Sequence, residues 1–195
     1  ELGVKRLVIG ECGHAWRVAD GYLAELTGEL DFLEPPHRRP YHIAEVTYAL
    51  WRTGRIRFDP HLNAGRAVSF HDSCNIARGG TFGQEAADPI RIPRALLAAA
   101  VPKVVEMSGS TVGRETFCCG AGAGLLGDDI EAQRLAGAGP RVEAYRAVVE
   151  TSNVTELVAM CAICKTQLGF ALAANGLPRE SVVSLHQVLG DALVV

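Results

Sequence analysis

The 195-residue chain alternates between two patterns of hydrophobic and polar positions. Short apolar runs rich in β-branched residues are typical of buried strands, whereas apolar residues spaced three and four positions apart indicate helices with one buried face. The first pattern predicts strands at 4–9, 67–70, 114–117, 154–160 and 182–185. The second predicts helices at 15–30, 41–53, 94–107 (with a kink or break at Pro102), 130–150 (interrupted at 137–140), 165–175 and from 186 onward, with a polar, glycine-rich loop at 77–93.

The alternation of strands and helices predicts an α/β fold. We expect a mainly parallel sheet with helices on both faces, as in a Rossmann-like domain. The order of strand, cysteine loop, helix and further helix occurs twice, first from Leu7 and again from Leu157. Residues 1–60 are therefore predicted to be the tail of a first, degenerate repeat, and residues 61–195 a complete second one. The front of the first repeat would then be missing from this chain.

Composition narrows the class of protein. Hydrophobic residues make up 48% of the chain, which is enough for a core, and the net charge of −3 argues against general nucleic-acid binding. No apolar run approaches the roughly 18 residues that a membrane-spanning helix needs. The chain has no secretory signal and begins at Glu1, so we expect a cytoplasmic protein that is processed or is part of a longer one. Six cysteines in this setting favour metal or redox chemistry over a disulfide framework.

The cysteines are grouped around one adjacent pair, Cys118-Cys119. Neighbouring Cα atoms are about 3.8 Å apart, which is too close for a relaxed disulfide, so two adjacent thiols are better suited to holding a metal. Forty-three residues separate the pair from Cys74, and forty-one separate it from the C-x-x-C motif of Cys161 and Cys164. Thiolates are the usual ligands of iron–sulfur clusters and of zinc.

The predicted strands place most of these cysteines at one edge of the sheet. The cysteines expected just past a strand end are Cys12, Cys74, Cys118, Cys119 and Cys161. The carboxyl edge of a parallel sheet is where ligands bind in open α/β folds. Cys164 should lie in the first turn of a helix, where the helix dipole stabilises a thiolate.

Each motif also has a simpler explanation. The cysteines could be small buried hydrophobic residues, and the C-x-x-C motif alone could be a thioredoxin-like dithiol. Residues 122–127 match G-x-G-x-x-G, which indicates either nucleotide binding or small residues that close around a bulky cluster.

Single residues around the site also have alternative interpretations. Cys12 is interpreted in three ways: as a residual ligand of the degenerate repeat, as a thiol near the substrate, or as an inert residue. Three histidines border the site and either donate to sulfur, deliver protons or bond to backbone: His14, His71 and His186. The arginines interpreted as ordinary solvated residues are Arg91, Arg94 and Arg141.

The sequence around the cysteines resembles a known family. The segments that carry the resemblance are His71-Asp72-Ser73-Cys74-Asn75, Cys118-Cys119-Gly120-Ala121-Gly122-Ala123-Gly124 and Cys161-Ala162-Ile163-Cys164-Lys165. They resemble the cysteine-rich CCG domain of heterodisulfide reductase-like iron–sulfur proteins. Within this family they look most like the DsrK-type catalytic subunit of the membrane complex of dissimilatory sulfur metabolism. The resemblance covers about residues 65–195 well and the front of the chain loosely.

The resemblance implies a noncubane [4Fe–4S] cluster that handles a disulfide or trisulfide in two one-electron steps. The implied cluster ligands are Cys74, Cys118, Cys119, Cys161 and Cys164, with Gly120 beside the cofactor and Cys12 and His14 as further candidates near the reacting atoms. One implied partner is a small DsrC-like sulfur-carrier protein with C-terminal cysteines. The others are cytochrome or iron–sulfur subunits of a membrane complex, to which this chain would be peripheral.

Two features depart from the family pattern. Both gaps between the cysteines are longer than usual, which indicates enlarged loops, and the ferredoxin-type run C-x-x-C-x-x-C-x-x-x-C-P is absent. Electrons would therefore enter from outside this chain. Two alternatives of other classes remain. One is an electron-transfer iron–sulfur subunit of a 2-hydroxy-acid or succinate oxidoreductase, and the other is a zinc-binding or metal-free scaffold domain.

Overall fold

The centre of the fold is a four-stranded parallel sheet with the strand order β5-β4-β6-β7. The computed structural model describes residues 3–28, 30–35, 38–83 and 88–194. The strands of this sheet are β4 (Ala67–His71), β5 (Lys103–Val104), β6 (Glu156–Ala159) and β7 (Val182–Ser184). Strands β4 and β6 are paired up to His71 and Ala159, so they end level with each other. The loops that follow these two strands therefore start side by side.

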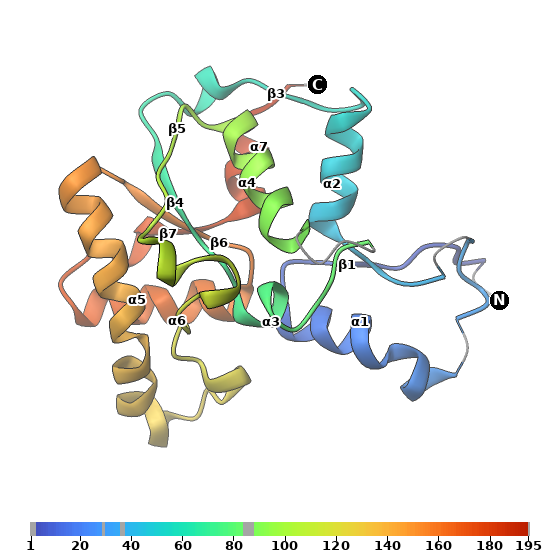
Figure 1. Ribbon diagram of the computed structural model, residues 1–195, viewed down its shortest axis with the longest axis horizontal. Helices are drawn as coiled ribbons and strands as arrows, with labels where there is room; N and C mark the ends of the chain where they lie inside the picture. Colours follow the sequence, from blue (N-terminus) through green and yellow to red (C-terminus); the bar gives the residue numbers. More distant parts are fainter. Residues whose placement is uncertain (1–2, 29, 36–37, 84–87, 195) are drawn as a thin grey trace.

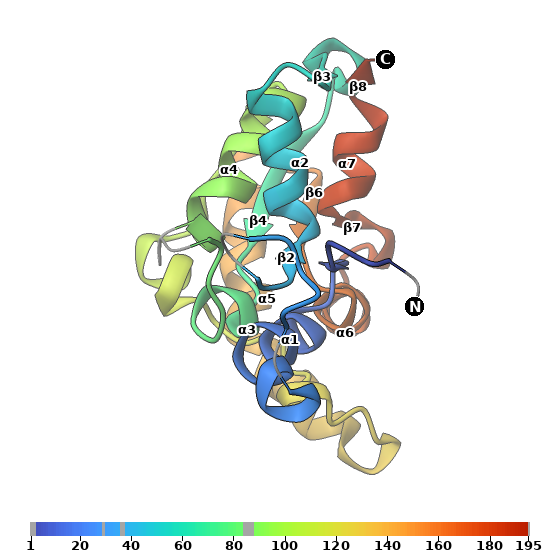
Figure 2. The same cartoon turned by 90° about the vertical axis from the view of Figure 1, so that its right-hand side faces the viewer.

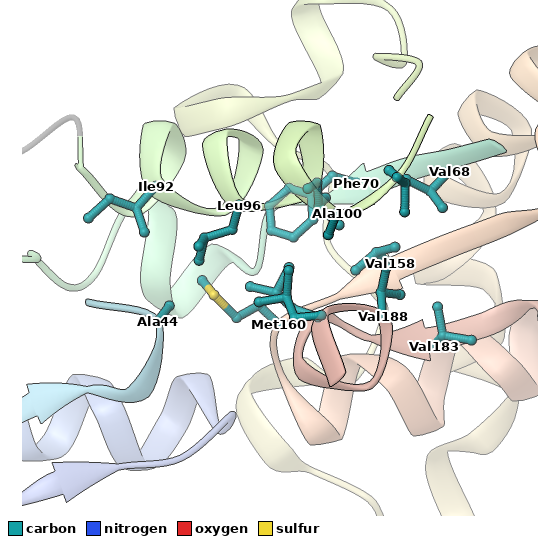
Figure 3. Close-up of a cluster of buried hydrophobic side chains, with 14 of the residues drawn as sticks. Ala44, Val68, Phe70, Ile92, Leu96, Ala100, Val158, Met160, Val183 and Val188 are labelled. Atoms are coloured by element: carbon teal, nitrogen blue, oxygen red, sulfur yellow. The ribbon is translucent and has the colours of Figure 1, made fainter. Parts of the chain in front are cut away.

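Helices cover both faces of this sheet (Figure 1), which confirms the predicted α/β architecture. One face is covered by α4 (Asp88–Ala100) and α7 (Leu185–Asp191), with α2 (Ile43–Arg52) beside α4, and the other by α5 (Glu131–Ser152) and α6 (Ala162–Ala174). Phe70, Val158 and Leu96 belong to the core under α4 and α7, part of which is drawn in Figure 3. Leu157 and Ala159 belong to the core under α5 and α6. Strand β6 serves both cores because successive side chains of a strand point to opposite faces.

A separate pair of parallel strands lies in the front of the chain. Strand β1 (Val8–Ile9) pairs with β2 (Tyr41–His42), and α1 (Gly13–Thr27) connects them. The order β1, α1, β2, α2 matches the order β6, α6, β7, α7, and both strand pairs are parallel. Figure 2 shows α1 at the end of the molecule where α3 (Cys74–Ala77) and α6 also lie. An antiparallel pair, β3 (Arg57–Phe58) with β8 (Leu193–Val194), joins the middle of the chain to its C-terminal part.

The helix predicted at 94–107 begins earlier than expected and breaks near Pro102 as predicted, but a strand rather than more helix follows the break. Helix α4 begins at Asp88, where Pro89 fits the first turn because no N–H is needed at that position. The helix ends at Ala100, since Pro102 cannot continue it and disfavours helical backbone in the residue before it. Strand β5 then forms against β4. The loop predicted at 77–93 is correspondingly too long, and its residues 84–87 lie outside the described residues.

The strand predicted at 114–117 does not form. Residues Gly113–Glu115 make a 3-10 turn instead. Thr116 Oγ1 donates to the carbonyl of Asp72 at 2.8 Å, and Arg78 donates to two carbonyls of the same segment at 3.1 and 2.8 Å. The prediction failed because this segment is held by side chains from distant elements rather than by a ladder of strand hydrogen bonds.

The helix predicted at 130–150 is continuous, without the expected interruption at 137–140. Helix α5 passes through Pro140, where the missing N–H costs a single hydrogen bond. Burial of Ala138, Val142 and Tyr145 in the core stabilises the helix across this point. The small residues at 137–139 also leave room for a neighbouring loop to approach the helix backbone.

Candidate metal centre

Three segments bring five cysteines to the carboxyl ends of β4 and β6. Cys74 opens α3, directly after β4. Cys161 is the N-cap residue of α6, and Cys164 lies in the first turn of that helix, as predicted. Cys118 and Cys119 come from the irregular segment before α5. The expectation that this pair follows a strand is therefore wrong, although the pair reaches the same edge of the sheet.

The five thiols influence one another's pKa in a continuous series. The series runs from Cys74 through Cys118, Cys119 and Cys164 to Cys161. All five are free cysteines, three of them buried and two half-buried. Unpaired thiols in mutual contact can share one bound metal group, whereas disulfide-bonded ones cannot. The structure thus brings the predicted ligands together, and their role as ligands stays a prediction.

Negative charge is concentrated on two of these sulfurs. Hydrogen bonds from Cys119 and Cys74 hold the pKa of the Cys118 thiol well below its usual range. A hydrogen bond from Cys164 lowers the pKa of Cys161 to about 5. The neighbouring thiols, followed by burial, raise the pKa of each of the other three cysteines, Cys74, Cys119 and Cys164. These interactions favour the thiolate form of Cys118 and Cys161 over that of the other three.

Two backbone amides support the same two thiolates. Gly13 N donates to Cys161 Sγ and Gly120 N donates to Cys118 Sγ, each at 3.3 Å. Gly13 is the first residue of α1, so the front of the chain reaches the site here. A Cβ at Gly13 would meet Ser73 Oγ at 2.8 Å and Cys161 Sγ at 3.4 Å. Only glycine permits this close approach without moving a neighbour.

His71 lies beside the buried thiols. It is the last residue of β4, its side chain is 1% exposed, and neither ring nitrogen has a hydrogen-bond partner. A ring nitrogen lies within 4.8 Å of the sulfurs of both Cys119 and Cys164. Burial and the nearby positive charge of Arg141 lower the pKa of His71 to about 3, so the ring is neutral at ordinary pH.

Asp72 ties the loop after β4 to α4 and to the segment that precedes the cysteine pair. Its carboxylate accepts two hydrogen bonds from Arg94, both at 2.8 Å, and one from Gly113 N at 2.7 Å. Arg94 also donates to Glu106 at 2.6 Å. The interpretation of Arg94 as an ordinary solvated residue is therefore wrong, because a buried carboxylate requires a cationic partner. Arg91 is more than half exposed, as expected.

Arg141 is also misjudged from the sequence, since its side chain is fully buried. The guanidinium donates to the Thr111 carbonyl, to Thr116 Oγ1 at 2.9 Å and to Met107 Sδ at 2.9 Å. Its central carbon lies 5.7 Å from the centre of the Phe117 ring, and its Nε has no partner. The surrounding residues are those of an ordinary helix, and no local pattern signals this burial.

Cys12 and His14 lie in the front of the chain, next to the site. Cys12 Sγ accepts from an amide of its own helix at 3.5 Å and so acts as the cap of α1. Both ring nitrogens of His14 are buried and without a hydrogen-bond partner. A Cβ at Gly124 would lie 3.7 Å from His14 Nε2, so the ring is next to the glycine-rich loop. The third histidine, His186, instead pairs through Nδ1 with a glutamate at 2.7 Å.

A family comparison covers the part of the chain that holds this centre. Residues 68–169 match the family named CCG, a cysteine-rich domain, and this range includes all five clustered cysteines. The chain belongs to the CCG family. The resemblance of this CCG chain to heterodisulfide reductase-like iron–sulfur proteins is thereby confirmed at the level of the family.

The alignments with similar proteins cover nearly the whole CCG chain. An Hdr-like menaquinol oxidoreductase iron–sulfur subunit of Archaeoglobus profundus is 29% identical over 221 residues, and iron–sulfur subunit 2 of the enzyme of that name in Archaeoglobus fulgidus is 32% identical over 220. Both alignments cover 100% of this chain and 38% of the relative. The EtfAB:quinone oxidoreductase of Syntrophomonas wolfei is 25% identical over 200 residues, covering 98% of this chain and 24% of the relative. The chain thus spans well under half the length of these relatives.

The described residues of the CCG chain fit an iron–sulfur cluster. Five unpaired thiols converge from separate segments, and two backbone amides are directed at their sulfurs. Native proteins rarely leave buried polar groups without partners, yet the nitrogens of His71 have none. A bound anionic group rich in sulfur would satisfy both observations.

Proposed function

We propose that this CCG domain binds an iron–sulfur cluster and serves as the module of an oxidoreductase that reduces or forms a disulfide or trisulfide. The proposed ligands are Cys74, Cys118, Cys119, Cys161 and Cys164, and the proposed cluster is a noncubane [4Fe–4S] cluster. The observation that carries the proposal is the convergence of these five free thiols at the carboxyl ends of β4 and β6, where each influences the pKa of a neighbouring thiol. When bound, such a cluster supplies one-electron steps.

The chain itself contributes positioning and protons. The amides of Gly13 and Gly120 donate to two of the sulfurs, and the buried His71 lies within 4.8 Å of the sulfurs of Cys119 and Cys164. Reduction of a disulfide consumes two electrons and two protons and yields two thiols. His14 has unpartnered ring nitrogens next to the glycine-rich loop, so we assign it the role of holding a proton for the departing thiolate. Cys12, at the start of the same helix, is the proposed thiol near the substrate.

The proposed partners follow from the DsrK-type resemblance. A small DsrC-like sulfur carrier would present its C-terminal cysteines, and cytochrome or iron–sulfur subunits of a membrane complex would exchange electrons with this domain. The names of the two Archaeoglobus relatives, which are iron–sulfur subunits of menaquinol oxidoreductases, support a membrane complex. None of the helices in the described ranges is long and apolar enough to cross a bilayer. We therefore propose a cytoplasmic domain that is peripheral to the membrane through its partners.

A second candidate function is electron transfer without disulfide chemistry. All three relatives are named for menaquinol or quinone, which favours this role. In that case the domain would pass electrons between other centres and quinone, and the substrate site would belong to another part of the protein. The absence of a ferredoxin-type cysteine run in this chain is compatible with either role.

The front of the chain is proposed to be the tail of a first, degenerate repeat, residues 1–60, followed by a complete domain at 61–195. The matching order of elements and the parallel pairing in both β1–β2 and β6–β7 support this division. So does the use of Cys12 and Cys161 as N-cap residues of corresponding helices. In the first copy, the position of Cys164 is taken by Ala15.

The test begins with iron, acid-labile sulfide and zinc content of the anaerobically purified chain, with matched variants Cys119→Ser and Cys12→Ser. We expect about four irons and four sulfides per chain. Cys119→Ser should lose the cluster, whereas Cys12→Ser should keep it because Cys12 lies outside the series of five thiols. One zinc without sulfide, or full iron in Cys119→Ser, would overturn the ligand assignment.

A second measurement separates the two functions. The electron paramagnetic resonance spectrum of the oxidised protein is recorded before and after a disulfide is added, and again with a menaquinone analogue. A signal that changes with the disulfide supports disulfide chemistry. A cluster that exchanges electrons with the quinone but gives the same signal with every disulfide tested supports the electron-transfer role.

A further inference from the structure

Two fully buried side chains beside the thiols carry N–H groups for which the described residues supply no acceptor. His71 has two unpartnered ring nitrogens, and a neutral imidazole carries one N–H. Arg141 has an unpartnered Nε–H while its other nitrogens are engaged. A buried donor without a partner costs on the order of 1–3 kcal/mol, so two at one place require an explanation.

The position of His71 restricts which acceptors it can reach. Its backbone is fixed at the end of β4 by pairing with Ala159 of β6, and its side chain is 1% exposed. The sulfurs of Cys119 and Cys164 lie within 4.8 Å of its ring nitrogen. Neither ring nitrogen hydrogen-bonds to a sulfur of the described residues, yet the separation is short enough for one bound atom to contact all three side chains.

The positive charge of Arg141 is also not balanced by a paired carboxylate of the described residues. No carboxylate among the described residues forms an ion pair with it, and nearby Asp72 is already engaged by Arg94. A buried cation without a compensating anion is strongly destabilising. Negative charge on Asp72, Cys119 and Cys164 acts to raise the pKa of Arg141 and opposes the effect of burial. The thiols are therefore the remaining source of compensation that is close by.

We propose that His71 and Arg141 form a buried donor pair that hydrogen-bonds to the thiolate-held group, balances its negative charge and raises its reduction potential. Neither side chain is a ligand in this proposal; both are positioning residues. Donors and positive charge near the sulfurs stabilise the reduced, more negative form of a cluster. The inference rests on the proposed iron–sulfur function.

The first experiment is a redox titration of the loaded chain with four variants. His71→Phe removes the donor and His71→Gln restores an N–H. Arg141→Met removes the charge and Arg141→Lys retains it. We expect each removal to shift the ratio of reduced to oxidised cluster about tenfold towards the oxidised form at a fixed potential, which is about 59 mV for a one-electron couple. The restoring variants should recover most of that shift.

Arg146→Met is the matched control, because Arg146 lies on the same helix α5 and is partly exposed, with its charge paired to Glu143 at 3.5 Å. It should leave the potential unchanged. A potential that is the same in His71→Phe and Arg141→Met as in the parent chain overturns the proposal. A potential that shifts equally in His71→Phe and His71→Gln overturns the donor role of His71.

A second experiment uses cobalt(II) and the metal-free chain, so that it does not depend on cluster assembly. Cobalt bound by thiolates absorbs strongly, which gives an affinity for each variant by titration. Arg141→Met should bind cobalt about tenfold more weakly than the parent, and Arg141→Lys and Arg146→Met close to normally. Equal affinity in all variants overturns the charge-balancing role even if the parent chain assembles a full cluster. Weak binding in Arg141→Met supports that role even if the natural group is not an iron–sulfur cluster.

Discussion

Replacement of Gly120 by alanine should damage both the stability of the fold and the candidate centre. Gly120 has a φ of +89°, which favours glycine, and it follows the Cys118-Cys119 pair directly. A Cβ at this position would overlap the carbonyl oxygen of Arg134 and would lie 2.9 Å from Ala138 N. Both atoms belong to the backbone of α5, so no side-chain rotation can relieve the overlap.

The magnitude follows from two separate costs. An L-residue with left-handed backbone costs about 1–2 kcal/mol, and overpacking costs about 1–3 kcal/mol. Gly120→Ala should therefore lower the free energy of unfolding by about 2–5 kcal/mol. Gly124 has a φ of +94°, but a Cβ there meets nothing closer than 3.7 Å. Gly124→Ala should thus show the first cost alone, about 1–2 kcal/mol.

The assay is urea unfolding of the metal-free chain, followed by circular dichroism, with metal content measured on the same variants. Gly21→Ala is the neutral control, since Gly21 is inside α1 with ordinary helical backbone and open space around it. We expect it to be unchanged or slightly more stable. If Gly120→Ala and Gly124→Ala cost the same within about 0.5 kcal/mol, the close contact of the cysteine loop with α5 would be refuted.

Three further predictions concern the scaffold. Burial and the nearby His186 lower the pKa of His42 to about 3, so between pH 6.5 and that value the unfolded chain binds a proton that the folded chain does not, and stability falls with pH. In urea unfolding, the loss of stability from pH 7 to pH 5 should be about 2 kcal/mol smaller in His42→Asn, which keeps a cap for α2, than in the parent chain. Arg94→Met should cost about 3 kcal/mol in the same assay, because it leaves the carboxylate of Asp72 buried without its cation. The side-chain amide of Asn63 donates to one carbonyl of α4 at 2.8 Å and to one of α7 at 3.0 Å. Asn63→Leu removes this donor and should lower the free energy of unfolding by about 2 kcal/mol. A change under about 0.5 kcal/mol would contradict the role of this amide.

The part of the centre after β6 is well predicted from the sequence because local signals agree there. A β-branched apolar run precedes Cys161, and a helical pattern follows it, so both the strand end and the helix start are readable. The same holds for Cys74 after β4. For these cysteines the chain alone indicates the sheet edge on which the sulfurs lie.

The cysteine pair and the charged residues around it are less predictable. The segment before Cys118 has weak strand character, but Arg78 and Asp72 hold it as a turn through contacts 36 to 41 residues distant in sequence. The burial of Arg141 depends on acceptors at Thr111 and Thr116, which the folded chain brings beside α5. Such partners are assembled by tertiary structure, so pattern and propensity in a local window cannot reveal them.

The hydrogen bond from Gly13 to Cys161 links the front segment of the chain, residues 1–60, to the candidate centre. All five clustered sulfurs belong to residues beyond 61, yet an amide from the front segment points at one of them at 3.3 Å. A ligand that keeps the Cys161 sulfur negatively charged strengthens the hydrogen bond from Gly13 N. Because the ligand binds the folded form, it also stabilises the packing of α1 against the site. Binding of a metal group at the centre should therefore slow the local unfolding of α1. Hydrogen exchange at the backbone amides of α1 would then report whether the centre is occupied, although none of the five clustered cysteines lies in that helix.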